Sequence, residues 1–214
     1  MTRGNPRFWS TILGLPFVIA GLWLNLGQSQ YPTAIGIPFL FFGIFVVIIG
    51  AYVQLVGAPE DPHLQETEKV ITTRHPTQRV AFVKIVTGLP LLIITVYLLF
   101  FTMAPYVYPT VTFIIGLYQF SSGLYTYWTN LLTRYYVTNE RIIKEYRFLS
   151  LRRDELPLKK VRGVQERKSI IETLVGLGNV RVASGGGRSL EIVMPNMGRP
   201  EQFAAEIRNA MSSE

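Results

Sequence analysis

The sequence predicts a membrane protein of mixed α and β class, with four transmembrane helices in two hairpins followed by a cytoplasmic module of antiparallel strands and a C-terminal helix. Long uncharged apolar runs fill the first part of the 214-residue chain, and most charged residues follow Arg134. The hydrophobic periodicity also changes there from helical to alternating. Only 16% of the residues are charged, against roughly 25% in soluble domains. We therefore expect a first hairpin in 1–57, a cytoplasmic loop in 58–79, a second hairpin in 80–130 and the module in 131–214.

Each hairpin is predicted from two apolar runs, residues 8–26 and 33–57 in the first and residues 85–103 and 107–128 in the second. Each run has about 20 residues, enough to cross roughly 30 Å of hydrocarbon as a helix. Buried core helices are the alternative, but four such runs in one small chain favour a membrane. None of them contains Asp, Glu, Lys, Arg or His. Because transporters and ion pathways place ionisable groups inside the membrane, we expect these spans to form an anchor or a docking surface.

The charges in the connections predict the orientation of the spans. The connections 27–32 and 104–106 carry no Lys or Arg, whereas the N-terminal tail, the loop and the module do. The positive-inside rule then places both termini in the cytoplasm, with Lys84 snorkelling at the cytoplasmic end of the third run. We expect an integral membrane protein of a prokaryotic cell membrane, or of the thylakoid membrane if the host is photosynthetic.

Glycines recur every seven residues in the apolar runs, most clearly at Gly36, Gly43, Gly50 and Gly57. A seven-residue repeat keeps one helix face toward a neighbour, and glycine there allows close approach of two backbones in a membrane. Two interpretations are open for this helix-docking seam. It either holds its own hairpin together or receives a helix of another membrane protein.

The loop 58–79 contains both histidines of the chain, His63 and His75, beside several acidic residues. Their spacing matches no metal-ligand motif, so we predict a solvated polar loop and no metal site. The chain has no cysteine, which excludes disulfides, Cys-ligated zinc and iron–sulfur clusters. We expect no cofactor.

Strands are predicted in the module from Arg134 onward. The segment "RYYVTNERIIKEY" is rich in Tyr, Val and Ile that alternate with polar residues, as do "NVRVAS" and "SLEIVMP". Between the last two segments, "GGGR" supplies the positive-φ residues of a tight hairpin. Pro200 then begins a helix, whose core face is predicted to consist of Phe203, Ile207 and Met211.

Three stretches of the module carry a family resemblance: "YYVTNERII", "ELPLKKVRGVQERKSIIETLVGLGNVRV" and "LEIVMPNMGRPEQFAAEI". Together with "RHPTQRVAFVKI" before the third run, they resemble the bacterial pleckstrin-homology-like (PH-like) membrane-flanked domain family. The resemblance covers about residues 72–212, so the first hairpin looks like an added element. It implies a PH-like antiparallel barrel or sheet with a C-terminal helix, which binds proteins or lipids without catalysis.

Basic residues are dense in the module just after the last predicted span. The anionic inner leaflet attracts such residues by about 1 kcal/mol each, and a solvated surface without a ligand is the alternative. We predict a membrane-surface or partner-binding site from Arg141, Lys144, Arg147, Arg152, Arg153, Lys159, Lys160 and Arg162.

Two functions remain open at the level of sequence. The "GGGRS" segment lacks the phosphate-loop pattern and the module has no histidine, so we expect no enzyme. The membrane already explains the basic residues, so we expect no nucleic acid as a partner. The first function is an accessory or assembly factor that binds other integral membrane subunits of a larger complex. The second is an anionic-lipid-sensing envelope or stress protein, acting alone or as a homo-oligomer.

Overall fold

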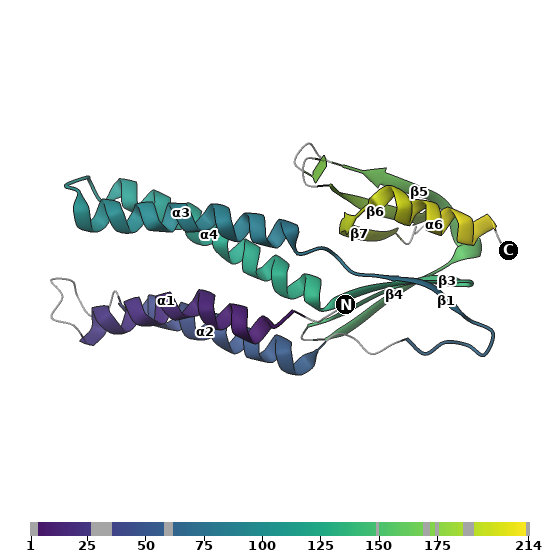
Figure 1. Cartoon of the computed structure of the whole chain (residues 1–214), viewed down its shortest axis with the longest axis horizontal. Helices are drawn as coiled ribbons and strands as arrows, with labels where there is room; N and C mark the ends of the chain where they lie inside the picture. The colour runs from purple at the N-terminus through teal and green to yellow at the C-terminus, as the bar shows by residue number, and fades with distance from the viewer. Residues whose placement is uncertain are drawn as a thin grey trace. The chain divides into compact units, whose positions relative to one another are not determined.

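The computed structural model describes residues 4–26, 36–57, 62–148, 150–168, 172–173, 176–185 and 191–212. The chain divides into two compact units, Met1–Gly57 and Ala58–Glu214. The first unit is helical, and the second combines a helical hairpin with two β-sheets and a C-terminal helix (Figure 1).

The first unit consists of α1 (Pro6–Leu26) and α2 (Gly36–Val56). Both helices agree with the predicted apolar runs. An added Cβ on Gly14 would meet Gly43, and one on Gly21 would meet Gly36. Because rising numbers in α1 face falling numbers in α2, the two helices run antiparallel as a closely packed hairpin.

The second unit begins with a short strand and then a helical hairpin. The strand is β1 (Val70–Arg74), and the hairpin consists of α3 (Arg79–Phe101) and α4 (Val107–Leu131). The remaining elements are β2 (Thr133–Thr138), β3 (Arg141–Arg147), β4 (Leu151–Pro157), the 3-10 helix η2 (Leu158–Lys160), β5 (Val161–Arg167), β6 (Leu177–Ser184), β7 (Glu191–Gly198) and α6 (Pro200–Ser212). The predicted change from helices to strands is thus confirmed, and it falls at the end of α4.

The strands form two antiparallel sheets. The first has the order β1-β2-β3-β4 and the second the order β5-β6-β7. The prediction of antiparallel strands with a C-terminal helix is therefore confirmed, but the described residues form two separate sheets and no closed barrel. The predicted "GGGR" turn between β6 and β7 lies largely outside the described residues.

One hydrophobic core joins the two sheets and α6. It is formed by alternate residues of the strands, such as Val180 and Val182 of β6, which are fully buried. Phe203 and Ile207 of α6 are also fully buried and Met211 packs against the same core, so the predicted face of this helix is confirmed. Figure 1 shows α6 lying along the sheet β5-β6-β7.

Three helices are long and apolar enough to cross a membrane: α1, α2 and α3. The sequence predicted four spans, and α4 is not among the three, although it has 25 residues and packs along α3. The difference comes from the Thr, Ser, Gln and Asn residues of α4, which lower its apolar character.

The prediction of a solvated polar loop at 58–79 is wrong for its second half. Val70–Arg74 forms β1, which pairs antiparallel with β2, for example Thr73 with Tyr136. Lys69 precedes this strand, and its backbone N–H donates to Asn139 Oδ1 at 2.7 Å. Four consecutive β-branched residues in "VITTR" favour a strand, but a five-residue run is a weak signal without its partner strand.

Candidate functional site

The α3–α4 hairpin is inserted between two paired strands. Four residues separate β1 from α3, and one separates α4 from β2. Asn130 Nδ2 donates to the carbonyl of Thr77 at 2.9 Å, and Gln78 Nε2 donates to the carbonyl of Tyr127 at 3.3 Å. The Thr77 N–H donates to Asn196 O of β7 at 2.8 Å. The base of the hairpin is therefore fixed to both sheets.

One side of this hairpin carries a polar flank, which we define as Lys84, Thr87, Gln119, Ser122 and Thr126. Lys84 Nζ donates to Ser122 Oγ at 3.2 Å and to Thr126 Oγ1 at 3.3 Å. Gln119 Nε2 donates to Thr87 Oγ1 at 3.1 Å. The Lys84 ammonium therefore binds hydroxyl groups of the neighbouring helix α4. The sequence predicts instead that it extends toward the end of its own helix. Among the described residues, no carboxylate neutralises this ammonium.

The glycine seam of α2 is filled by α1. A Cβ on Gly43 would lie 2.7 Å from Gly14 O, and one on Gly50 would lie 2.2 Å from Ser10 Cβ. The backbones can be this close because glycine occupies the contact positions of α2 and, as Gly14 and Gly21, two contact positions of α1. Gly36, Gly43 and Gly50 therefore dock a helix of the same chain, which is the first of the two interpretations above.

Gly57 lies outside α2, unlike the other three glycines of the repeat. It directly follows the last residue of α2, and its φ of 71° lies in the left-handed region. Its N–H donates to Val53 O at 3.2 Å. This geometry is that of a glycine ending a helix, so the observed role of Gly57 is helix termination.

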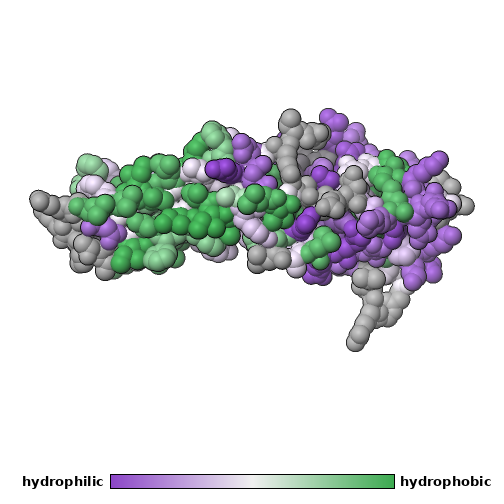
Figure 2. All heavy atoms as spheres, turned by 90° about the horizontal axis from the view of Figure 1, so that it is seen from below, coloured by the Kyte–Doolittle hydropathy of each residue, from purple (hydrophilic) through white to green (hydrophobic). Residues whose placement is uncertain are grey.

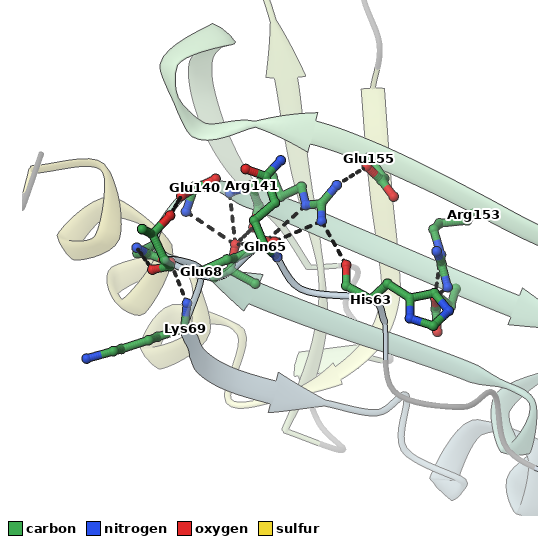
Figure 3. A network of polar contacts seen from close by, with 12 residues as sticks. His63, Gln65, Glu68, Lys69, Glu140, Arg141, Arg153 and Glu155 are labelled. Carbon is green, nitrogen blue, oxygen red and sulfur yellow. Dashed lines mark hydrogen bonds and ion pairs between the residues drawn. The ribbon is translucent and has the colours of Figure 1, made fainter.

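A polar network fastens the segment before β1 to the sheet (Figure 3). The Glu68 side chain is fully buried, and Arg141 Nη2 donates to its Oε2 at 2.8 Å. A second nitrogen of Arg141, Nη1, donates to Glu155 Oε2 at 2.6 Å. Thr138 Oγ1 donates to Glu68 Oε1 at 2.8 Å. One arginine of β3 thus holds a carboxylate from the connecting segment and another from β4.

The Glu68 carboxyl stays ionised in this network. Burial alone would raise its pKa, but the hydrogen bonds from Arg141, Thr138 and the backbone of Gln65, together with the charge of Arg141, outweigh burial and lower the pKa. The ionised Glu68 and the Arg141 guanidinium thus act as a clamp between the segment before β1 and strand β3.

The register of the first sheet divides the predicted basic site. Thr133, the first residue of β2, pairs with Tyr146 near the end of β3, whereas Arg141 pairs with Pro157 at the opposite end. A strand of six residues spans roughly 20 Å. The group at the end nearer α4 consists of Arg147, Arg152 and Arg153, and the group at or beyond the far end consists of Arg141, Lys159, Lys160 and Arg162.

Several of these cations have partners inside the domain. Arg153 binds the buried Glu145 at 2.5 Å, and Arg152 lies 3.3 Å from Asp154. Lys144, in the middle of β3, is half-buried, which lowers its pKa, and its Nζ donates to a β7 carbonyl at 3.1 Å. Together with Arg141, at least half of the eight predicted residues therefore contact groups of the same domain. Lys160 and Arg162 are exposed.

The hydropathy of the surface differs between the helices and the strands. Figure 2 shows hydrophobic residues gathered over the helices and hydrophilic residues over the strand-rich part. Most exposed large apolar side chains belong to α1, α2, α3 and α4. This pattern is the reverse of a soluble protein and fits helices that face lipid or other membrane helices.

Sequence reasoning missed two features of this site. The first is the Glu68 clamp, which depends on a partner 73 residues away, and only the strand-like "VITTR" beside Glu68 could have indicated it. The second is the polar flank, which forms only when α3 and α4 are paired. Its signal was the set of polar residues at i, i+3 and i+7 in α4, Gln119, Ser122 and Thr126.

No group of three or more His, Cys, Asp or Glu side chains that could hold a metal occurs in the described parts of the chain.

No curated protein and no solved structure matches the sequence. A family model, the bacterial PH domain, matches residues 85–211, which is more than half of the 214 residues. The match starts within α3 and ends in α6, so it covers most of the second hairpin and six of the seven described strands, but not β1. The chain therefore belongs to the bacterial PH domain family.

Proposed function

We propose that the chain is a non-catalytic accessory or assembly factor of a larger membrane complex. In this proposal the α3–α4 hairpin crosses the membrane and docks against a helix of another integral membrane protein. The PH-like domain then holds a cytoplasmic part of the same complex. The observation that carries the proposal is the polar flank of the hairpin.

The polar flank is unfavourable in free energy when it faces lipid, but it can form hydrogen bonds when it faces another protein. A lysine within a membrane helix costs up to about 3 kcal/mol when it faces lipid at the centre of the bilayer, and less near the end of the helix. Among the described residues, Lys84 is bound only to two neutral hydroxyls, and the Gln119 side-chain oxygen accepts no hydrogen bond. Polar groups of this kind join membrane helices by hydrogen bonds. A partner helix with a carboxylate or amide near Lys84 would supply hydrogen-bond partners for both the Lys84 ammonium and the Gln119 side-chain oxygen.

The attachment of the hairpin supports a coupled role for the PH-like domain. Both membrane helices continue almost directly into β1 and β2, which pair with each other. A partner on the hairpin would therefore sit at a fixed position relative to the domain. Sensing of anionic lipid by one broad basic face has less support, because seven of the eight cations are divided between the two ends of the sheet and Lys144 lies in the middle of β3.

The test is co-purification of the tagged full-length chain in mild detergent, with mass spectrometry of the bound proteins. We expect near-stoichiometric membrane subunits with the wild type and their loss with the double variant Lys84→Leu/Gln119→Leu. Val86→Leu is the matched control, since Val86 is exposed and lies two residues, or about 200° around α3, from Lys84. Recovery of only the bait and lipid with the wild type would contradict the proposal and favour the lipid-sensing alternative.

A further inference from the structure

The connection between β3 and β4 lies beside the cytoplasmic end of α4. The Arg147 N–H donates to Leu132 O, just after α4, at 3.0 Å. The Tyr146 side chain lies beside that of Tyr125, which is six residues before the end of α4. Six residues correspond to about 9 Å along a helix. The end of this β-hairpin therefore runs alongside the last turns of α4.

The last turns of α4 lie beside the first turns of α3. The rings of Phe82 and Tyr127 lie 6.1 Å apart between centroids. A Cβ on Gly123 would lie 2.8 Å from the backbone nitrogen of Ile85. Since α3 begins at Arg79 and is apolar and long enough to cross a membrane, its first turns mark the depth of the lipid headgroups. The β3–β4 connection is level with them.

The chemistry of this connection suits that depth. Leu151 is 57% exposed, and among the described strand residues only Val70 and Ile71 are comparable large apolar side chains. Val70 pairs with Thr138, so this other pair is at the far end of the sheet. The Arg152 side chain beside Leu151 is 75% exposed. An exposed leucine next to an exposed arginine matches the boundary between acyl chains and phosphates.

The local charge has the sign that anionic lipid requires. Between residues 144 and 154 there are four basic and two acidic residues, a net charge of 4 − 2 = +2. The basic ones are Lys144, Arg147, Arg152 and Arg153, and the acidic ones are Glu145 and Asp154. The acidic pair is already bound to Arg153 and Arg152.

We propose that the β3–β4 tip, defined as Arg147, Phe148, Leu151 and Arg152, rests in the headgroup region of the membrane that holds α3 and binds anionic lipid there. Leu151 enters the boundary of the acyl chains, and Arg152 binds lipid phosphate. The tip is a third attachment of the PH-like domain, in addition to α3 and α4. This inference goes beyond the protein partner proposed above and does not depend on it.

The absence of cysteine allows a direct test on the full-length chain. Leu151→Cys and Ile71→Cys each carry a single nitroxide spin label, with the protein reconstituted in phosphatidylcholine vesicles with or without phosphatidylglycerol. Ile71 is the matched control because it is 49% exposed but at the far end of the sheet. We expect the label at 151 to collide more with oxygen and less with a water-soluble nickel chelate than the label at 71.

This protection at 151 is expected to increase with phosphatidylglycerol, and adding Arg152→Gln to Leu151→Cys is expected to remove the increase. Equal nickel accessibility at the two sites in both kinds of vesicle overturns the proposal. Protection that is the same without phosphatidylglycerol overturns its anionic-lipid part. A partner protein is absent from these vesicles, so failure here leaves the co-purification test unaffected.

Discussion

Glu68 shows how a single side chain joins a distant segment to the sheet. A buried carboxylate is unstable unless charge and hydrogen bonds compensate for the lost water. Here Arg141, Thr138 and the Gln65 N–H surround it. Arg141 also binds Glu155, so one arginine holds three segments together: the residues before β1, β3 and β4.

We expect Glu68→Gln to lower the free energy of unfolding by about 2 kcal/mol at pH 7, because Arg141 loses one of its two carboxylate partners. The Glu68 pKa is lowered in the folded state from its ordinary value of 4.5. Its stabilisation is therefore complete above 4.5 and is lost as the pH falls through the lower, folded value. Chemical denaturation at pH 7 and below pH 4.5 measures both effects.

The matched control for this variant is Glu66→Gln, at an exposed glutamate two residues away. We expect this control to change the free energy of unfolding by less than about 0.5 kcal/mol at either pH. A Glu68→Gln cost that is the same at both pH values would mean that its charge does not stabilise the fold.

At the level of elements, glycine spacing determines how each helical hairpin packs. A Cβ on Gly43 would lie 2.7 Å from both Gly14 O and the Val18 backbone nitrogen. Backbone atoms cannot move aside as a flexible side chain can. The α3–α4 hairpin uses the same device, since a Cβ on Gly88 would lie 2.8 Å from the Phe120 backbone nitrogen.

We expect Gly43→Ala to separate α1 from α2 and to destabilise the first hairpin by about 1–3 kcal/mol, as overpacking of a close contact does. Thermal unfolding in detergent, followed by tryptophan fluorescence, measures this because Trp9 and Trp23 both lie in α1. Ile48→Ala is the control on the outer face of α2, where Ile48 is 58% exposed. An unchanged transition for Gly43→Ala would mean that the helices are not in close contact.

The elements differ in how well the sequence predicted them, for physical reasons. Helices with uncharged apolar runs are determined by local composition, so α1, α2 and α3 were predicted to within a few residues at most ends. The core face of α6 followed from the spacing of Phe203 and Ile207. In contrast, β1 is stabilised by β2, some 60 residues later, and by Arg141. Local patterns do not contain such long-range pairing, and this also explains the division of the predicted basic site.

At the level of the whole second unit, the PH-like domain is discontinuous in sequence. The α3–α4 hairpin separates β1 from β2, yet these strands pair along Thr72–Arg74. Arg74 also binds Glu206 of α6 at 2.5 Å, so β1 is held by its neighbour strand and by the C-terminal helix. A change in the angle between α3 and α4 would directly strain the hydrogen bonds between β1 and β2. The hairpin and the domain are thus expected to move as one body.

In the proposed function, α3 and α4 cross the membrane together, with their connection on the outer side. In intact cells we expect an impermeant maleimide to label Met103→Cys, because Met103 is fully exposed in the α3–α4 connection. Lys160→Cys, exposed after β4, is expected to react only after permeabilisation, since Lys- and Arg-rich segments remain cytoplasmic. The cysteine-free wild type is the blank. Labelling of both positions only after permeabilisation would mean that the hairpin does not cross, and the polar flank would then face the cytoplasmic surface of the membrane.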